Sequence, residues 1–415
     1  MSDIVVGLDI GTSNVRVVIA EYDENNRLRI VGLGKAPSTG LRSGVIVNIE
    51  ATMRAVTAAI EAAELMSGYE VHSCFVGIGG TQVDSLNSTG QVSVSNKSKE
   101  INQNDINRVI ETASHLSIPL DRQVLHVVPQ MYTVEHGVNM LQKTKDPINV
   151  IGTRLYVDVH IVTATTTTVQ NIFTCASRAG YTVDGVMLKT LATAQAVLTD
   201  EEKELGSILI DMGGGSTDVI VVADGAPICT DSVPIGGLLV TNDISVVRGI
   251  STETAEKIKI SDGCCWEPLV DKNEEVLILG VNGRPESIPR TELCDIIQPR
   301  VGEIFEMIRE KISAKIKDRR LSGNVVLVGG GAKMSGVIEL ASTVFNTESV
   351  RIGLPSNLGG LTDDYRTPDS ATAIGLVVAN SEVLQHKGEK RSRKDYSRKK
   401  QGFMDKIAKF FEDMF

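Results

Sequence analysis

Apolar runs alternate along the chain with stretches in which apolar residues recur at every third or fourth position. The first pattern is typical of buried strands and occupies 4–8, 15–20, 28–33, 71–78, 155–164, 208–210, 219–222 and 325–328. The second pattern is typical of amphipathic helices and dominates 49–66, 103–116, 167–180 and 293–316. Strands and helices that alternate in this way predict a layered α/β architecture.

Two segments interrupt this alternation. Residues 84–102 are rich in Ser, Asn and Gly, and the stretch that follows to 147 carries its own helix and strands. Residues 238–289 similarly hold a helix over 252–260 and a strand near 276–281. We expect both segments to be insertions into the alternating core, the first of them a small subdomain.

Two near-copies of one motif follow buried strands and lead into further strands. The sequence is DIGTS at 9–13 and DMGGGST at 211–217. Backbone N–H groups at such turns can face phosphate oxygens, and the Asp that ends each strand can hold a divalent cation through water. One copy alone would equally describe an ordinary β-hairpin. Two copies in one chain predict a nucleotide clamp.

A third glycine turn follows the strand at 325–328. It reads GGGA at 329–332, and a helical stretch over 335–343 comes next. Glycines there would let a ligand lie against the backbone with no Cβ in the way. A tight strand-to-helix connection is the alternative.

Length and composition fit a soluble globular protein of two or more domains. The chain has 415 residues, of which 42% are apolar and 23% charged. The N-terminus lacks a signal-peptide pattern and no apolar run is long enough to span a bilayer, so we expect a cytosolic body. The six scattered cysteines include no C-x-x-C and predict reduced thiols rather than disulfides or a zinc site.

The net charge of −10 conceals a basic segment near the C-terminus. Between 387 and 400 there are eight Lys or Arg residues and two acidic residues. An acidic body repels nucleic acid except at such a segment, so we expect no nucleic-acid partner. Almost no apolar residue lies in this stretch, which predicts a flexible, extended linker.

The segment 402–415 contains four of the chain's eight Phe residues. At about 100° per residue, the apolar side chains occupy one face. They are Phe403, Met404, Ile407, Ala408, Phe410, Phe411, Met414 and Phe415. This pattern predicts a short amphipathic helix in the headgroup boundary of a membrane, where several tails together would give firm attachment. A helix docked on its own body is the alternative, at a backbone cost of roughly 1–2 kcal/mol per linker residue.

The order of the three glycine motifs resembles that of the actin, Hsp70 and sugar-kinase superfamily and, within it, the FtsA family of bacterial cell-division proteins. The resemblance extends from about 4 to 379 and again over the C-terminal helix. Its more discriminating segments are LHVVPQ at 125–130, RL at 154–155, VHIVT at 159–163, EKIK at 256–259 and the segment 290–300.

The resemblance implies an actin-like, two-lobed α/β fold with a duplicated RNase H-like core and ATP in the central cleft. Subdomain 1A would hold 1–83 and 161–195, 1C would be the insert 84–160, 2A would hold 196–237 and 300–381, and 2B would be 238–299. A basic linker over 382–401 and the helix over 402–415 would follow.

The resemblance also implies site residues for ATP and Mg²⁺. The first phosphate loop would be Gly11, Thr12, Ser13 and Asn14, and the second would be Gly213, Gly214, Gly215, Ser216 and Thr217, with Gly236 nearby. The adenosine would face Gly329, Gly330, Gly331 and Ala332, with Glu256 and Lys259 at the adenine or ribose. Asp9 and Asp211 would face the cation. For Glu256 and Lys259, a surface i,i+3 pair is the alternative.

Hydrolysis is expected to be slow or absent. Superfamily members that cleave ATP briskly place Glu or Gln in the helix after the first half, where it can orient the attacking water. Here the corresponding stretch, 188–196, contains no acid, and Gln195 is the only catalytic candidate.

By resemblance, the body polymerises on the cytoplasmic face of the inner membrane at the division site, where 1C recruits later division proteins. Subdomain 2B would receive the acidic, apolar C-terminal peptide of FtsZ, with Arg290 and Arg300 as candidates; a solvated helix face is the alternative. Rival hypotheses are a sugar or acetate kinase, a polyphosphate phosphatase, and a pilus-assembly adaptor of the PilM type, which lacks the terminal helix.

Overall fold

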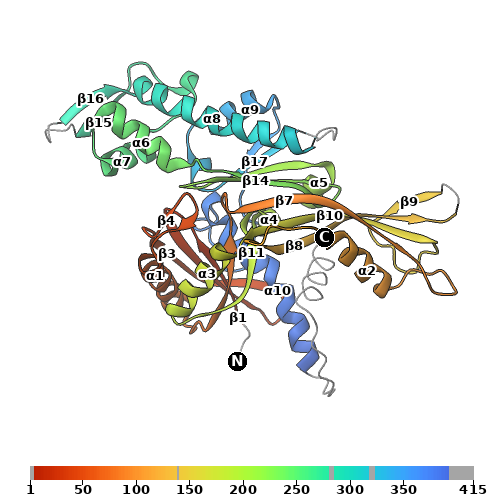
Figure 1. The fold of residues 1–415 in the computed structure, drawn as a ribbon. Coiled ribbons are helices and arrows are strands. Elements are labelled where there is room, and N and C mark those ends of the chain that lie inside the picture. Colours follow the sequence, from red (N-terminus) through yellow and green to blue (C-terminus); the bar gives the residue numbers. More distant parts are fainter. Residues whose placement is uncertain (1–3, 138–139, 280–284, 317–322, 392–415) are drawn as a thin grey trace.

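Two lobes, each built on a five-stranded sheet, stack on one another in the computed structural model (Figure 1). The structure describes residues 4–137, 140–279, 285–316 and 323–391. The first sheet has the order β11-β6-β1-β2-β3 and consists of β1 (Ile4–Ile10), β2 (Asn14–Tyr22), β3 (Leu28–Pro37), β6 (Ser73–Ile78) and β11 (Thr182–Leu188). The second has the order β14-β13-β12-β17-β18 and consists of β12 (Ser207–Met212), β13 (Thr217–Ala223), β14 (Ala226–Val233), β17 (Asn324–Val328) and β18 (Val350–Ile352).

The second sheet repeats the topology of the first. In the first lobe, β1 pairs antiparallel with β2 and parallel with β6. In the second lobe, β12 pairs antiparallel with β13 and parallel with β17. The predicted duplicated core is therefore confirmed. The glycine turn at 9–13 connects the antiparallel strands β1 and β2, and the turn at 211–217 connects β12 and β13.

Helices cover both sheets. Those of the first lobe and its junction are α1 (Ile49–Ser67), α3 (Thr166–Arg178), α4 (Lys189–Val197) and α10 (Ala371–Arg391). Those of the second lobe are α5 (Asp200–Leu205), α6 (Gly237–Arg248), α7 (Thr252–Asp262), α8 (Arg290–Ile316) and α9 (Val337–Phe345). The short elements are β4 (Leu41–Arg42), β5 (Val45–Ile46), β15 (Glu275–Leu279), β16 (Pro285–Pro289) and the 3₁₀ turns Glu267–Leu269, Gly330–Lys333 and Pro368–Ser370.

Helix α1 shows how the sequence sets these elements. The side chain of Asn48 caps it by accepting a hydrogen bond from the N–H of Ala51, and Gly68 ends it with φ 74°. Four alanines on its buried face, Ala51, Ala55, Ala59 and Ala63, let the helix lie close to β3. At Gly34 of β3, a Cβ would lie 1.8 Å from the carbonyl oxygen of Ala59, and only glycine permits this approach.

A third unit projects sideways from the lobes (Figure 1). Its four-stranded sheet has the order β7-β10-β8-β9 and consists of β7 (Val83–Ser93), β8 (Arg122–Glu135), β9 (Leu141–Thr144) and β10 (Arg154–Thr165), with α2 (Gln103–Ser114) packed against it. This insert has a hydrophobic core of its own, which includes Ile106, Val109 and Val157. The expectation that the first interruption carries its own helix and strands is confirmed.

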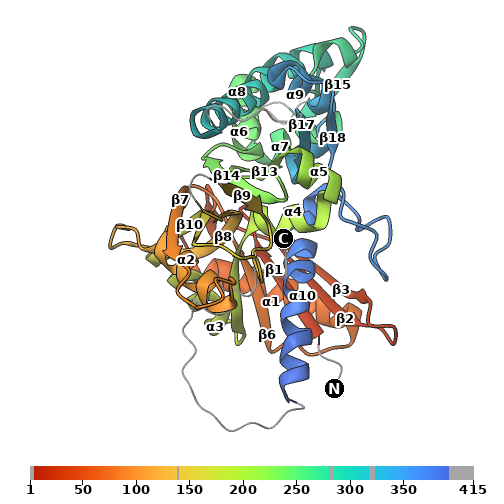
Figure 2. The same cartoon turned by 90° about the vertical axis from the view of Figure 1, so that its right-hand side faces the viewer.

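The lobes meet where α4 contacts the start of α10 (Figure 2). At Gly375 of α10, a Cβ would lie 2.1 Å from the carbonyl oxygen of Ala192 on α4, so the two backbones are in direct contact. Thr372, one turn earlier, donates a hydrogen bond to Asp211 at 3.2 Å. The helix contact thus reaches the end of β12 in the second lobe.

Several predicted boundaries differ from the observed elements. The border at 160/161 falls inside β10, and the border at 299/300 falls inside α8, which continues through Pro299. The linker expected over 382–401 is wrong in its first half, because α10 extends to Arg391. That half consists largely of good helix formers such as Glu, Leu, Gln and Lys, so the helix continues where apolar residues become rare. The amphipathic helix predicted over 402–415 lies outside the described residues.

Candidate functional site

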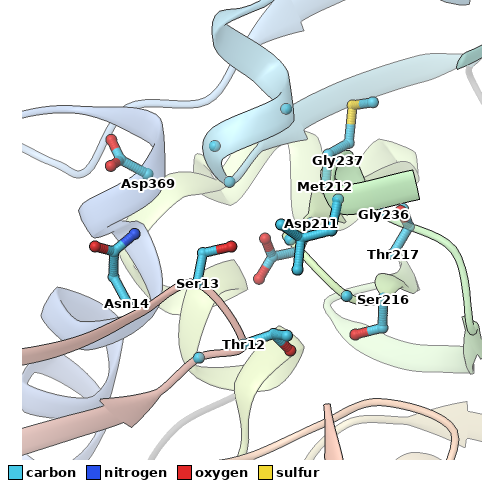
Figure 3. Close-up of a pocket in the computed structure, with 18 of the residues that line it drawn as sticks. Thr12, Ser13, Asn14, Asp211, Met212, Ser216, Thr217, Gly236, Gly237 and Asp369 are labelled. Carbon is cyan, nitrogen blue, oxygen red and sulfur yellow. The ribbon is translucent and has the colours of Figure 1, made fainter. Parts of the chain in front are cut away.

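A cavity of about 410 Å³ lies between the two lobes, and both hairpins face it (Figure 3). The structure brings most of the predicted site residues together around it. The predicted residues that line it are Asp9, Gly11, Thr12, Ser13, Asn14, Asp211, Gly213, Gly214, Gly215, Ser216, Thr217, Gly236, Glu256, Lys259, Gly329, Gly330 and Gly331. Ala332 does not line it, because its side chain is buried in the core of the second lobe.

The two hairpins have the same local geometry. The N–H of Gly11 donates to the carbonyl of Asn14 at 3.1 Å, and the N–H of Gly213 donates to the carbonyl of Ser216 at 3.0 Å. The hairpins also touch each other, since a Cβ on Gly214 would lie only 2.1 Å from Ser13 Oγ. Glycine at this position therefore lets the two turns close on one cavity.

The first residues of helix α6 lie next to the second hairpin in space. The N–H of Gly237 donates to the carbonyl of Gly213 at 3.0 Å, and the N–H of Leu238 donates to that of Gly214 at 2.8 Å. The positive end of the α6 dipole is thus fixed beside the turn. An anion in the cavity would be stabilised by this helix end as well as by the hairpin amides.

Three carboxylates and one ammonium group form the charged base of the cavity. Lys189 Nζ lies 2.7 Å from Asp9 Oδ1 and donates to the carbonyl of Ile10 at 2.8 Å. Asp218, on β13, accepts from the N–H of Gly80 at 3.1 Å. Asp211 completes the group, so it carries a formal charge of −2 when all four residues are ionised.

The crowding of negative charge shifts the pKa values of these groups. Burial, with Asp218 and Asp9 nearby, raises the pKa of Asp211 to about 7. Burial also raises the pKa of Asp218. Burial opposes ionisation of Lys189, but the carboxylates, Asp9 foremost, outweigh it and raise the pKa of the ammonium. The base of the cavity is therefore deficient in positive charge.

A second charged group lies at the rim of the cavity. Asp369 pairs with Arg16 and Lys333, which come from opposite lobes. Burial opposes its ionisation, but the two cations outweigh burial and lower the pKa of Asp369. Lys35 also lines the cavity, and burial together with Arg16 lowers its pKa.

Glu256 and Lys259 face the cavity and are also paired with each other. Their charged atoms lie 2.6 Å apart, and Lys259 further donates to the carbonyl of Gly237 at 3.1 Å and to Thr241 Oγ1 at 2.8 Å. Only 10% of the Lys259 side chain is exposed. The two residues therefore form an i,i+3 pair that is part of the cavity wall, with the Lys259 side chain mostly buried and the Glu256 side chain 38% exposed.

Gln195 is not placed to act in this cavity. Its amide oxygen accepts a hydrogen bond from Lys203 at 3.1 Å, and it is not among the lining residues. Gln195 lies six residues after Lys189 on α4, so at about 100° per residue it points roughly 120° away from that lysine. In this arrangement the structure does not place Gln195 where it could orient a catalytic water in the cavity.

Arg290 and Arg300 are not brought together either. They lie ten residues apart on α8, or about 15 Å along its axis. Arg290 pairs with Glu274 at 2.7 Å, whereas Arg300 pairs with Asp243 at 2.6 Å and also contacts Glu303. Only Arg300 borders a second hollow, a groove of about 500 Å³ between α6 and α8.

The α6–α8 groove is lined by both apolar and charged residues. Its lining residues are Asn242, Asp243, Val246, Val247, Asp295, Ile296, Pro299, Arg300 and Glu303. Val246 and Val247 are 71% and 62% exposed. Three carboxylates and one guanidinium line it, whereas the acidic peptide implied by the family resemblance would favour a basic site.

Sequence reasoning missed Lys189, Asp218 and Asp369 as residues of the central cavity. Asp218 directly follows the second hairpin, and a charged residue inside the apolar strand 217–223 was a usable signal. Lys189 likewise follows the buried residues Met187 and Leu188. No comparable pattern marks Asp369, whose neighbours in space come from distant segments.

Other expectations concern cysteines, metals and membranes. All six cysteines are buried and free, as expected. In the described part of the chain, no three or more His, Cys, Asp and Glu side chains converge as a metal centre. Among the residues that the structure covers, no helix combines the length and apolar character needed to cross a bilayer.

Solved structures with the same architecture include actin-like proteins. The PilM–PilN type IV pilus biogenesis complex contains a chain that matches with a TM-score of 0.63 and 16% identity, over 90% of this chain and 97% of that one. MreB 5 of Spiroplasma citri, bound to AMPPNP, matches with a TM-score of 0.55 and 15% identity, over 94% of this chain and 99% of that one. At this identity the likeness shows an actin-like fold.

Sequence comparison is more specific. Residues 208–375 match the model of the cell division protein FtsA, and residues 80–163 match that of the SHS2 domain inserted in FtsA. The cell division protein FtsA of Borreliella burgdorferi is 41% identical over 92% of this chain and 91% of that protein. The FtsA proteins of Pseudomonas aeruginosa and Escherichia coli K12 are 39% and 34% identical, each over 90% of this chain and 88% and 89% of their own lengths. The chain therefore belongs to the FtsA family of bacterial cell division proteins.

Proposed function

We propose that this chain is an ATP-binding, actin-like cell-division protein that polymerises on the cytoplasmic face of the inner membrane at the division site. There it tethers the FtsZ ring to the membrane and recruits later division proteins through the insert. The observation that carries this proposal is the pair of glycine hairpins that face each other across one cavity between duplicated lobes. The relatives at 34–41% identity support the cell-division role.

The hairpins would hold the phosphates of ATP through backbone amides. The turn that begins at Gly11 would hold them from the first lobe, and the turn that begins at Gly213 from the second. The glycine turn after β17 would receive the adenosine, because a Cβ on Gly330 would meet no atom within 4 Å. Glu256 and Lys259 would border the ribose or adenine. The MreB 5 protein of the same fold was solved with AMPPNP bound, which supports an adenine nucleotide as the ligand.

A divalent cation fits the base of the cavity. The cavity base carries a formal charge of −2 when its groups are ionised, and burial, with Asp218 and Asp9 nearby, raises the pKa of Asp211 to about 7. Asp211 and Asp9 would hold Mg²⁺ through water, which suits a hard cation that keeps part of its hydration shell. The ion would neutralise charge on the phosphates.

Turnover is proposed to be slow or absent. No Glu or Gln of α4 lines the cavity, since Gln195 points away from it. A kinase or phosphatase on the same scaffold remains the rival, and a phosphate-release assay with candidate sugars, acetate and polyphosphate separates the two. Turnover with any of them at rates typical of enzymes, above about 1 s⁻¹, would contradict the scaffold proposal.

The α6–α8 groove is the proposed site for the C-terminal peptide of FtsZ. Its apolar lining residues would contact the apolar side chains of the peptide. A peptide carboxylate could reach Arg300 by replacing Asp243 or Glu303 as its partner. Arg290 lies outside the groove and keeps its pairing with Glu274.

The last part of the proposal is membrane attachment through 402–415. It is tested by co-sedimentation of the full chain with vesicles that contain anionic lipid, with and without ATP. Truncation after Gln401 and Phe411→Glu should leave the protein in the supernatant while it still binds ATP. Glu412→Gln, on the polar face of the predicted helix, is the matched control and should pellet like the parent. Pelleting of the truncated chain would contradict the anchor.

A further inference from the structure

Lys189 is a mostly buried cation to which the proposed ATP site assigns no ligand contact. It is the first residue of α4, and only 15% of its side chain is exposed. Its ammonium lies beside Asp9 and lines the central cavity. A polar group that is withdrawn from water in this way needs compensating partners, and here they are all at the base of the cavity.

The stability of helix α4 does not explain why a lysine occupies position 189. A cation at the first residue of a helix opposes the positive end of the helix dipole. Strand β6 and the residue that follows it leave room for its stem, since a Cβ on Gly77 would lie 3.0 Å from Lys189 Cγ and one on Gly79 would lie 3.2 Å from Lys189 Cδ. The local backbone is therefore shaped around this side chain.

The contacts of Lys189 direct it to the first hairpin. The carbonyl of Ile10, which accepts from Nζ at 2.8 Å, immediately precedes Gly11. Asp9 and the carbonyl of Ile10 account for two of the three N–H donors of an ammonium. The ammonium thus lies beside the first hairpin at the charged base of the cavity. If both hairpins hold the phosphates of a triphosphate, the outermost phosphate is expected at this base.

We propose that Lys189 contacts the terminal phosphate of a bound nucleoside triphosphate, so that this site prefers ATP to ADP even when Mg²⁺ is absent. The inference rests on the proposed ATP site and adds to it a residue that distinguishes a triphosphate from a diphosphate. A lysine suits this task because it acts on phosphate as a point charge. Its fixed charge takes over part of the neutralisation that a divalent cation provides in such sites.

The test measures the dissociation constants of ATP and ADP for the full chain, with Mg²⁺ and with excess EDTA. In EDTA the parent should keep a preference for ATP of about tenfold, the size expected for one charge-assisted hydrogen bond. Lys189→Met should abolish this preference mainly by weakening ATP, whereas Lys189→Arg should retain most of it. Lys203→Met is the matched control, because Lys203 is equally buried but lies on α5, outside the cavity.

Equal weakening of both nucleotides by Lys189→Met, or an unchanged ratio, would overturn the inference while leaving the ATP site intact. If Lys189→Met does not fold, the parent decides the matter alone: loss of its whole ATP preference in EDTA overturns the inference. A parent that binds neither nucleotide under any condition contradicts the ATP site itself, and the inference falls with it.

Discussion

Asp218 of the second lobe accepts hydrogen bonds from the backbone N–H of Gly80 in the first lobe, with its two oxygens 3.1 and 3.2 Å from that nitrogen. Gly80 lies just before β7, the first strand of the insert, whose Ser85 donates to the carbonyl of Thr230 on β14 at 2.8 Å. Two polar contacts near the start of β7 therefore join the second lobe to the first lobe and to the insert.

Removing the acceptor at position 218 should loosen this junction. Asp218→Ala leaves the buried N–H of Gly80 without its partner, so we expect a loss of about 1.5–3 kcal/mol in the free energy of unfolding. Asp218→Asn keeps an acceptor oxygen and removes the charge that burial disfavours, so its stability should stay near that of the parent. Thermal unfolding followed by circular dichroism measures both. Equal destabilisation by the two variants would show that the charge, not the hydrogen bond, matters.

Closing the space between the hairpins should weaken nucleotide binding. In Gly214→Ala the new methyl group would lie 2.1 Å from Ser13 Oγ, so one turn must move away from the other. We expect the affinity for ATP to fall by at least about tenfold, as for a binding geometry displaced by roughly 1 Å. Gly302→Ala on α8, where a Cβ meets no atom within 4 Å, is the control. Equilibrium titration with a fluorescent ATP analogue decides, and unchanged affinity in Gly214→Ala would be evidence against the clamp.

The ion pair between Arg300 and Asp243 predicts in which direction substitutions in the groove change the affinity for the peptide. Asp243→Asn releases Arg300 and removes one negative charge, so the FtsZ C-terminal peptide should bind more tightly, by about threefold or more. Val246→Asp replaces an apolar lining residue of the groove with a carboxylate and should weaken binding by about tenfold or more. Leu277→Asp, on β15, replaces a residue that is 72% exposed and outside the groove, and should have no effect. Fluorescence anisotropy of a labelled peptide provides the measurement, and equal affinities for all three variants would remove the groove from the proposal.

Two buried imidazoles should make the fold sensitive to mild acid. Burial lowers the pKa of His126 to about 3, and burial with Lys315 and His126 nearby lowers the pKa of His160 to about 3. Both are neutral in the fold but gain a proton in the unfolded chain below about pH 6.5, so stability is present above that pH and is lost as pH falls. Each should reduce the free energy of unfolding by about 1.4 kcal/mol per pH unit below 6.5.

His160→Asn tests this pH dependence. Thermal unfolding midpoints between pH 7.5 and 5 should fall less steeply in this variant than in the parent. The exposed His136, on the β8–β9 hairpin, serves as the control through His136→Asn and should keep the parental slope. A parental slope in His160→Asn would show that other groups govern the acid response.

The sequence was most informative where the signal is local. The hairpins after β1 and β12 were found because a buried strand that ends in Asp and a glycine turn forms a pattern within ten residues. Gln195 was selected as the catalytic candidate by its residue type within the segment 188–196. Its position on α4 instead directs the side chain away from the cavity. The predicted start of the linker at 382 was wrong because a scarcity of apolar residues was interpreted as the absence of a helix. The residues there are largely good helix formers, and α10 continues to Arg391.

The amino-acid sequence by itself determined the alternation of strands and helices, the duplicated glycine hairpins and the family, because these depend on periodicity and short-range motifs. Only the tertiary structure decided that Lys189 meets Asp9, that Asp218 holds Gly80, and that Arg300 but not Arg290 borders the groove. Each of these relationships joins residues tens to hundreds of positions apart or depends on the phase of a helix. They arise when the two lobes and the insert pack together, and no single segment encodes that packing.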